Sequence, residues 1–164
     1  MNRQLIETIK QKALSDKVPI MEDAGLNYVI AYLKDNNLSS LLEIGTAVGY
    51  SSICFASSNP KLKIVTLEKD EQRHNIAKEN IRLAKLENRV AAVLADAREY
   101  DLNDMFDVIF LDGPKAHNQQ LFERYLKNLK AEGTVIVDNV YFHGFVDNPE
   151  LLEKKRLKPL VRKL

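Results

Sequence analysis

A loop with two glycines, followed by an acidic side chain, is the first pattern in this sequence that suggests binding chemistry. Gly45 and Gly49 interrupt the stretch LLEIGTAVGYSS, and Glu68 ends the next apolar run about twenty residues beyond the loop. In folds of alternating strands and helices, an acid at this distance hydrogen-bonds the hydroxyl groups of a ribose. The pattern predicts a nucleoside cofactor, and the alternative is a tight turn that holds no ligand.

The spacing of the glycines argues against two common nucleotide sites. A dinucleotide fingerprint needs G-x-G-x-x-G, whereas Thr46 stands here where the second glycine would be. A loop for a nucleoside triphosphate would carry G-K-S or G-K-T, and neither is present.

A second set of polar residues ends two later apolar runs. Asp112 closes FLDGPK, and Asp138 and Asn139 close VIVDN. Three oxygen ligands with no histidine or cysteine beside them suit a small hard cation, Mg²⁺ above all. Each acid alone would be an ordinary polar strand end, which is the alternative interpretation.

Short, nearly continuous runs of Val, Ile and Leu predict the elements that would position these residues. Such runs are typical of strands buried on both faces, and helical spacing appears between them. Strand alternating with helix predicts a doubly wound α/β fold, a mainly parallel sheet with helices on both faces. The expected strands cover 40–44, 63–68, 89–95, 106–112 and 133–139, and the expected helices lie around 26–33 and over 69–86 and 119–130.

Length and composition set the outer limits. The 164 residues suit a single domain over 1–164, and a net charge of +1 gives no global field for nucleic acid or membrane. One cysteine excludes an intrachain disulfide and favours a reducing, cytoplasmic location. No signal peptide or membrane-spanning run is visible, so no membrane partner is expected.

The stretch E-I-G-T-A-x-G-Y-S resembles motif I of the class I methyltransferases, which have a Rossmann-like fold and bind S-adenosylmethionine. The resemblance implies that the backbone at this loop approaches the methionine part of the cofactor. The implied cofactor residues are Glu43 and Ser51 at the amino and carboxylate ends, Gly45 and Thr46 in the loop, Glu68 on the ribose, Asp96 and Ala97 beside the adenine, and Asp112.

Two of these assignments have plain alternatives. Asp96 could be a simple turn acid after the third strand. Upstream, VPIMEDAG resembles a segment of the same family in which a methionine covers the cofactor, here Met21. Judged from the bare sequence, Met21 would more often be core packing.

The pair DGPK and DN resembles the cation-dependent O-methyltransferases, the group that contains the catechol and caffeoyl-CoA enzymes. Carried over, Asp112, Asp138 and Asn139 bind Mg²⁺ or Mn²⁺, and Asp112 and Lys115 are catalytic, with Lys115 as the candidate base. A metal lowers the pKa of a bound hydroxyl, and a lysine near a cation loses its proton more easily. The alternative for Lys115 is a solvated loop lysine.

The resemblance is closest to a bacterial branch that methylates 5-hydroxyuridine in the tRNA anticodon, so a tRNA anticodon loop is the expected partner. A small catechol-like molecule is the alternative substrate, because both present two neighbouring oxygens. The basic C-terminus would contact phosphates, or would form a solvated helix face. Its basic residues are Lys154, Lys155, Arg156, Lys158, Arg162 and Lys163.

The sequence departs from the family at its C-terminal end. The class I sheet ends in a β-hairpin, whereas the 25 residues after Asn139 are predicted to form loop and helix. A missing hairpin would uncover the apolar edge of the fifth strand, which favours pairing with another chain, as in a homodimer. It also leaves open a truncated form that binds cofactor without turnover.

Overall fold

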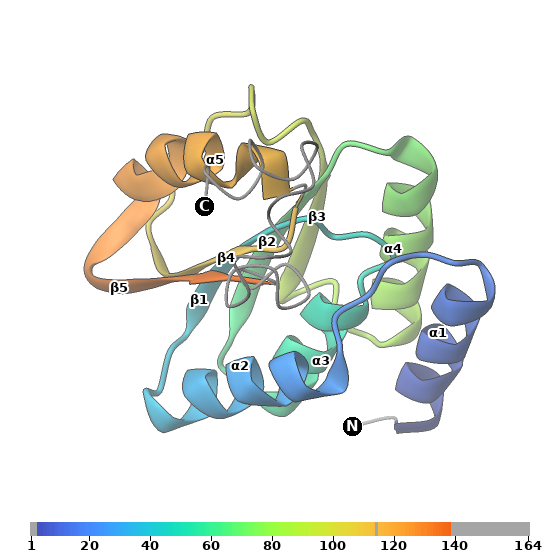
Figure 1. Cartoon of the computed structure of the whole chain (residues 1–164). Helices are drawn as coiled ribbons and strands as arrows, with labels where there is room; N and C mark the ends of the chain where they lie inside the picture. The colour runs from blue at the N-terminus through green and yellow to red at the C-terminus, as the bar shows by residue number, and fades with distance from the viewer. Residues whose placement is uncertain (1–2, 114, 139–164) are drawn as a thin grey trace, which may run out of the picture.

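The computed structural model describes residues 3–113 and 115–138, and its centre is a parallel sheet of five strands (Figure 1). The strand order is β3-β2-β1-β4-β5, so the order reverses beside β1, the first strand in the chain. The strands are β1 (Ser40–Ile44), β2 (Lys63–Glu68), β3 (Val90–Leu94), β4 (Phe106–Leu111) and β5 (Leu129–Val137).

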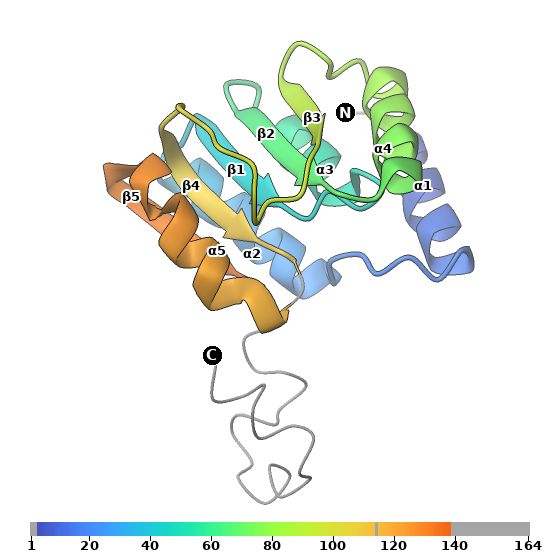
Figure 2. The same cartoon turned by 90° about the horizontal axis from the view of Figure 1, so that it is seen from above.

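Helices cover both faces of this sheet, as Figure 2 shows for α5 on one side and α2 and α3 on the other. The helices are α1 (Arg3–Ser15), α2 (Asp23–Asp35), α3 (Tyr50–Ser58), α4 (Glu71–Leu83) and α5 (Asn118–Tyr125), with short 3₁₀ turns η1 (Lys115–His117) and η2 (Leu126–Asn128). The predicted doubly wound fold is confirmed.

Alternation along the strands divides the core between the two faces. On β1, Leu41 belongs to the core cluster that holds residues of α1 to α4, whereas Leu42 belongs to the cluster that holds Leu121 and Tyr125 of α5. The near-continuous apolar runs in the sequence therefore reflect strands that are covered on both sides.

The register brings the carboxyl ends of the strands to one edge. Ile44 pairs with Leu67 on β2 and with Leu111 on β4, and Leu111 pairs with Val137 on β5. The residues directly after these strands therefore meet at the point where the strand order reverses, which is where ligands bind in such sheets.

The predicted end of the last helix and the predicted start of the last strand, at 133, are both wrong. The expected helix over 119–130 ends as an α-helix at Tyr125, and Leu129 and Lys130 already belong to β5. Leu129 pairs with Phe106 on β4 and packs in the core beneath α5, so sheet pairing outweighs the helical spacing of the local sequence.

The remaining expectations about the C-terminus lie outside the described residues. The hairpin, the basic segment and Asn139 all fall within 139–164. Within the part of the chain that the structure describes, no helix has both the length and the apolar character needed to cross a membrane.

Candidate active site

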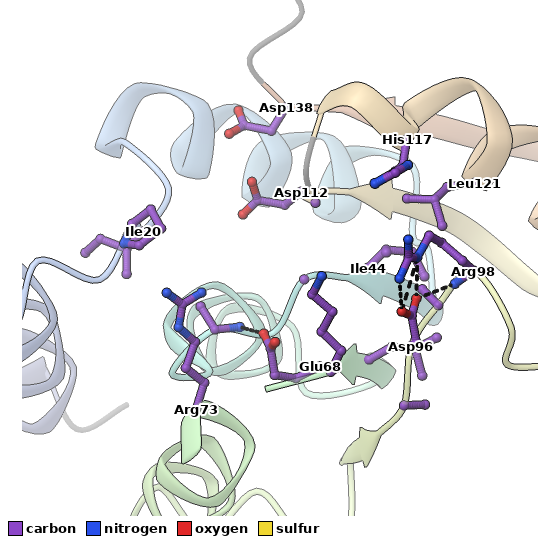
Figure 3. A pocket seen from close by; sticks show the side chains of 18 of the residues that line it. Ile20, Ile44, Glu68, Arg73, Asp96, Arg98, Asp112, His117, Leu121 and Asp138 are labelled. Carbon is purple, nitrogen blue, oxygen red and sulfur yellow. Dashed lines mark hydrogen bonds and ion pairs between the residues drawn. The ribbon is translucent and has the colours of Figure 1, made fainter. Parts of the chain in front are cut away.

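A cavity of about 600 Å³ opens at the carboxyl edge of the sheet (Figure 3). The cavity is lined by the last residues of β1 and β2 and by the loops that follow β1 to β4. Asp138, the residue directly after β5, completes this edge. The walls include Ile44, Gly45, Ala47, Leu67, Glu68, Lys69, Ala95, Asp96, Ala97, Arg98, Asp112, Gly113 and Asp138, with Pro19, Ile20, Glu22, Gly25, Arg73, His117 and Leu121 from the helices and their approaches.

The glycine loop is shaped first by the protein's own packing. Gly45 has a φ of +109°, and a Cβ atom there would lie 2.4 Å from the backbone oxygen of Asp112. Gly49 has a φ of +80°, and a Cβ atom there would lie 3.4 Å from the Cβ of Ala77. Gly45 also lines the cavity. Because it has no side chain, the loop can pack against the residue that follows β4 and still leave this wall of the cavity open.

Glu43 lies beneath the loop and is fully buried. Its carboxylate accepts hydrogen bonds from Ser51 at 2.5 Å, from Thr66 at 2.6 Å and from the Ser52 hydroxyl. Burial raises the pKa of Glu43, and the three hydroxyl donors oppose that rise. The predicted residues Glu43 and Ser51 are thus brought together, but behind the cavity wall.

Thr46 takes part in the same buried network. Its hydroxyl shares a 2.6 Å hydrogen bond with the hydroxyl of Thr66, and only 1% of Thr46 is exposed. Met21 is also buried rather than on the wall; its Cε lies 3.2 Å from where a Cβ of Gly25 would stand.

Glu68 reaches the cavity from the end of β2. One carboxylate oxygen accepts the backbone N–H of Ala47 at 2.8 Å, and the other accepts that of Asp70 at 2.9 Å. These two bonds fix the carboxylate in the orientation that Figure 3 shows, with lone pairs left on both oxygens for a ligand.

Asp96 and Ala97 line the cavity after β3, and Asp96 forms an ion pair with a neighbouring side chain. The Arg98 side chain donates to both oxygens of Asp96, at 2.5 to 3.1 Å. The guanidinium, together with the backbone N–H of Arg98, holds the pKa of Asp96 well below its usual range. Asp96 therefore also orients Arg98 on the cavity wall.

Asp112 and Asp138 point into the cavity from neighbouring strand ends (Figure 3). Backbone hydrogen bonds place them: the N–H of Asp112 donates to Ile44 and that of Asp138 donates to Leu111. Oxygen donors of this kind fit a hard cation such as Mg²⁺.

Two predicted partners of these acids are not placed. Asn139 and the side chain of Lys115 lie outside the described residues, although the backbone of Lys115 begins the turn η1. Among the side chains that are described, no group of three or more His, Cys, Asp or Glu is placed to hold a metal ion.

Several wall residues were not predicted from the sequence. Arg73 projects from the first turn of α4, five residues after Glu68, and His117 lies just before α5. Gly25 on α2 lies near Asp138. Of these residues, only Arg73 had a sequence signal that could have found it, since it follows Glu68 closely in the sequence.

The sequence profile of the O-methyltransferase family matches residues 1–164. The chain belongs to this family. Among solved structures, a candidate caffeoyl-CoA O-methyltransferase from Staphylococcus aureus is 35% identical to this family member, with a TM-score of 0.87 over 96% of this chain and 77% of that one. An O-methyltransferase from Bacillus cereus, solved with S-adenosylhomocysteine, is 27% identical, with a TM-score of 0.83 over 99% of this chain and 78% of that one.

Curated relatives include a catechol O-methyltransferase from Niastella koreensis. It is 32% identical over 133 residues, which are 75% of this O-methyltransferase-family chain and 57% of the relative. The chain spans between 46% and 69% of the length of five such relatives, and less than two thirds of most of them.

Proposed function

We propose that the chain binds S-adenosylmethionine in the cavity and transfers its methyl group to a hydroxyl oxygen of an acceptor. The observation that carries the proposal is the placement of Glu68, Asp112 and Asp138 in one cavity at the reversal point of the sheet. Glu68 would hold the ribose, and the two aspartates lie at the ends of β4 and β5. The relative from Bacillus cereus, solved with S-adenosylhomocysteine, supports the same cofactor.

The transfer step is a displacement at carbon. A base removes the proton of the acceptor hydroxyl, the oxygen bonds to the methyl carbon, and the bond from that carbon to the sulfonium sulfur breaks. The electron pair of the broken bond stays on sulfur, so the products are a methyl ether and S-adenosylhomocysteine. Lys115 is the candidate base by resemblance.

A divalent cation, Mg²⁺ or Mn²⁺, belongs to the proposal. Asp112 and Asp138 would hold it, with Asn139 as the third ligand that the resemblance implies. When bound, such a cation lowers the pKa of a neighbouring hydroxyl and fixes its position. The residues of the chain itself orient the cofactor and the acceptor.

A small catechol-like molecule is the acceptor we favour. Such a molecule presents two adjacent oxygens. The relatives named as catechol and caffeoyl-CoA O-methyltransferases support an acceptor of this kind. The second candidate is 5-hydroxyuridine in a tRNA anticodon loop, favoured by the branch resemblance and the basic residues 154–163. Its 5-hydroxyl and O4 offer the same two-oxygen pattern, and anticodon loops offer unstacked bases.

Transfer of a labelled methyl group from S-adenosylmethionine tests the proposal, with a catechol and a tRNA containing 5-hydroxyuridine as acceptors. We expect methylation of the catechol, loss of it in excess EDTA, and loss of it in Asp138→Ala with cofactor affinity kept. Asp23→Ala is the matched control, because Asp23 is 63% exposed and pairs with Lys10. Full activity in EDTA would overturn the metal requirement.

The tRNA arm has its own signature. If tRNA is the substrate, neutralising Lys154, Lys155 and Arg156 together weakens tRNA binding and flattens its salt dependence, by a slope of about 0.7–0.9 per lost phosphate contact. The same change leaves a free catechol acceptor unaffected. Methylation of catechol with no methylation of the tRNA would dismiss this second candidate.

A further inference from the structure

The turn from Thr46 to Gly49, directly before α3, has an uncommon backbone conformation. Ala47 has a φ of +47°, in the left-handed region that residues with a Cβ atom rarely adopt. The backbone N–H of Gly49 donates to the carbonyl of Thr46 at 2.8 Å and closes the turn. A strained conformation of this kind persists only where surrounding groups hold it. The contacts around the turn therefore decide its shape, and with it the part of the cavity wall that Ala47 forms.

Two side chains from distant elements hold this turn. One oxygen of Glu68, at the end of β2, accepts the backbone N–H of Ala47 at 2.8 Å. The amide nitrogen of Asn80, on α4, donates to the backbone carbonyl of Val48 at 2.8 Å. The first bond fixes the peptide group before Ala47, and the second fixes the peptide group after Val48. The backbone between these two groups is therefore held at both ends.

Packing of α4 against the loop gives Asn80 a fixed base. A Cβ atom at Gly49 would lie 3.4 Å from the Cβ of Ala77, which stands on α4 about one turn before Asn80. Val48 is 4% exposed, so water would be a poor substitute for Asn80 at the Val48 carbonyl. The described walls of the cavity do not include Asn80, so it can act on a ligand there only through the loop.

We propose that Asn80 is a positioning residue for the cofactor, which acts by orienting the carboxylate of Glu68. By holding the Val48 carbonyl, Asn80 keeps the N–H of Ala47 on Glu68. Without Asn80 the strained turn relaxes, and the carboxylate keeps only its bond to the backbone N–H of Asp70. The inference rests on the proposed function, since Glu68 is the residue that would hold the ribose.

A double-mutant cycle between Asn80 and Glu68 tests this coupling, with S-adenosylhomocysteine binding measured by calorimetric titration. We expect Asn80→Leu, which removes the amide donor, to weaken binding roughly fivefold or more, as the loss of one hydrogen bond predicts. In the Glu68→Ala background the same change should weaken binding less than about twofold, because the carboxylate that Asn80 orients is already gone. Asn80→Gln, which keeps an amide donor, should recover part of the affinity.

Asn75→Leu is the matched control, because Asn75 is an exposed asparagine on the same helix, and this change should leave the affinity unaltered. Urea titration establishes that each variant is folded. Asn80→Asp, which keeps the size of the side chain but has no amide donor, takes the place of Asn80→Leu if that variant is unfolded. An equal loss of affinity with and without Glu68 would overturn the inference, and so would no loss in Asn80→Leu. If the unmodified chain did not bind S-adenosylhomocysteine, the proposed function itself would fail, and the inference with it.

Discussion

At Gly45 the missing side chain is required by the backbone of a neighbouring strand. The φ of +109° is strained for any L-residue, and a Cβ would lie 2.4 Å from the Asp112 oxygen. We expect Gly45→Ala to lower the free energy of unfolding by about 2 kcal/mol or more, measured by urea titration. Gly113→Ala is the control, because its nearest neighbour stands at an ordinary 3.7 Å. Equal losses in the two variants would contradict this account.

Glu43 allows a prediction about pH. Its folded-state pKa is raised by burial, so the folded chain binds this proton more tightly than the unfolded chain. The stability that Glu43 contributes is therefore greatest below about pH 4.3, near the unfolded pKa of a glutamate, and is lost as the pH rises through the folded pKa.

Glu43→Gln removes this titration and turns one acceptor into a donor that faces a hydroxyl. We expect a loss of about 1–3 kcal/mol in the free energy of unfolding at acid pH, from a mispaired buried group. The deficit should shrink at higher pH, because only the unmodified chain then loses the contribution of Glu43. Urea titrations at acid and at mildly alkaline pH measure both values, and a deficit that grows with pH would refute the sign.

Asp107 joins three strands at the edge of the sheet opposite the cavity. Its carboxylate accepts the backbone N–H groups of Ser39 and Ser40 at the start of β1, and the ammonium of Lys130 on β5 at 2.8 Å. Burial alone would raise its pKa, but the ammonium and the serine donors outweigh burial and hold the pKa below the usual range.

Asp107→Asn should therefore cost stability mainly above the pKa of an unfolded aspartate. A depressed pKa contributes stability that is present above about pH 4 and is lost as the pH falls below it. We expect the variant to lose about 1–3 kcal/mol at neutral pH and to show a flatter acid limb than the unmodified chain. Thermal unfolding across acid pH checks both, and an unchanged acid limb would rule out this role.

The elements were predictable where the local pattern and the tertiary burial agree. β1, β2 and β4 lie close to their predicted bounds because an unbroken apolar run fits a strand covered on both faces. The structure of 126–130 was not predictable in this way. Leu126 and Leu129 continue the helical spacing of the sequence, but Leu129 pairs with Phe106 in the sheet. Pairing of this kind depends on a strand more than twenty residues away in sequence.

The site was predictable at strand ends and less so behind them. Gly45, Glu68, Asp96, Ala97, Asp112 and Asp138 reach the cavity because the register of a parallel sheet aligns those ends. Glu43 alternates with Ile44 on β1 and faces the other side, where Ser51 and Thr66 bind it. Resemblance in sequence does not reveal that the hydroxyl of Ser51 already donates a hydrogen bond to the carboxylate of Glu43.

At the scale of the whole molecule, the reaction rate of the one cysteine, Cys54, can report how often the folded core opens. Cys54 lies on α3 and is 5% exposed in the core cluster that also holds residues of α1 and α2, and burial raises the pKa of its thiol to about 12. A thiol with that pKa carries very little thiolate at neutral pH, so it reacts slowly even when reached. We expect thiol reagents to label the native chain only as fast as it unfolds.

The measurement is labelling rate against urea concentration. The rate should rise along the same curve as global unfolding, and a saturating S-adenosylhomocysteine concentration should slow it if that ligand binds the folded chain. Fast labelling in water, independent of urea, would mean that this part of the core opens locally.

The pairing of β1 with β4 also sets an order of events in time. Leu41 of β1 pairs with Val108 of β4, and β2 and β3, which come between them in sequence, lie on the other side of β1 in the sheet. Closing so long a loop is entropically slow, which is why sheets of distant strands fold later than local helices. Gly45 and Asp112 touch across this same pair. During synthesis, the contact between the glycine loop and Asp112 can form only after the final third of the described chain has been made. The cavity is therefore incomplete until β4 and β5 have left the ribosome and joined the sheet.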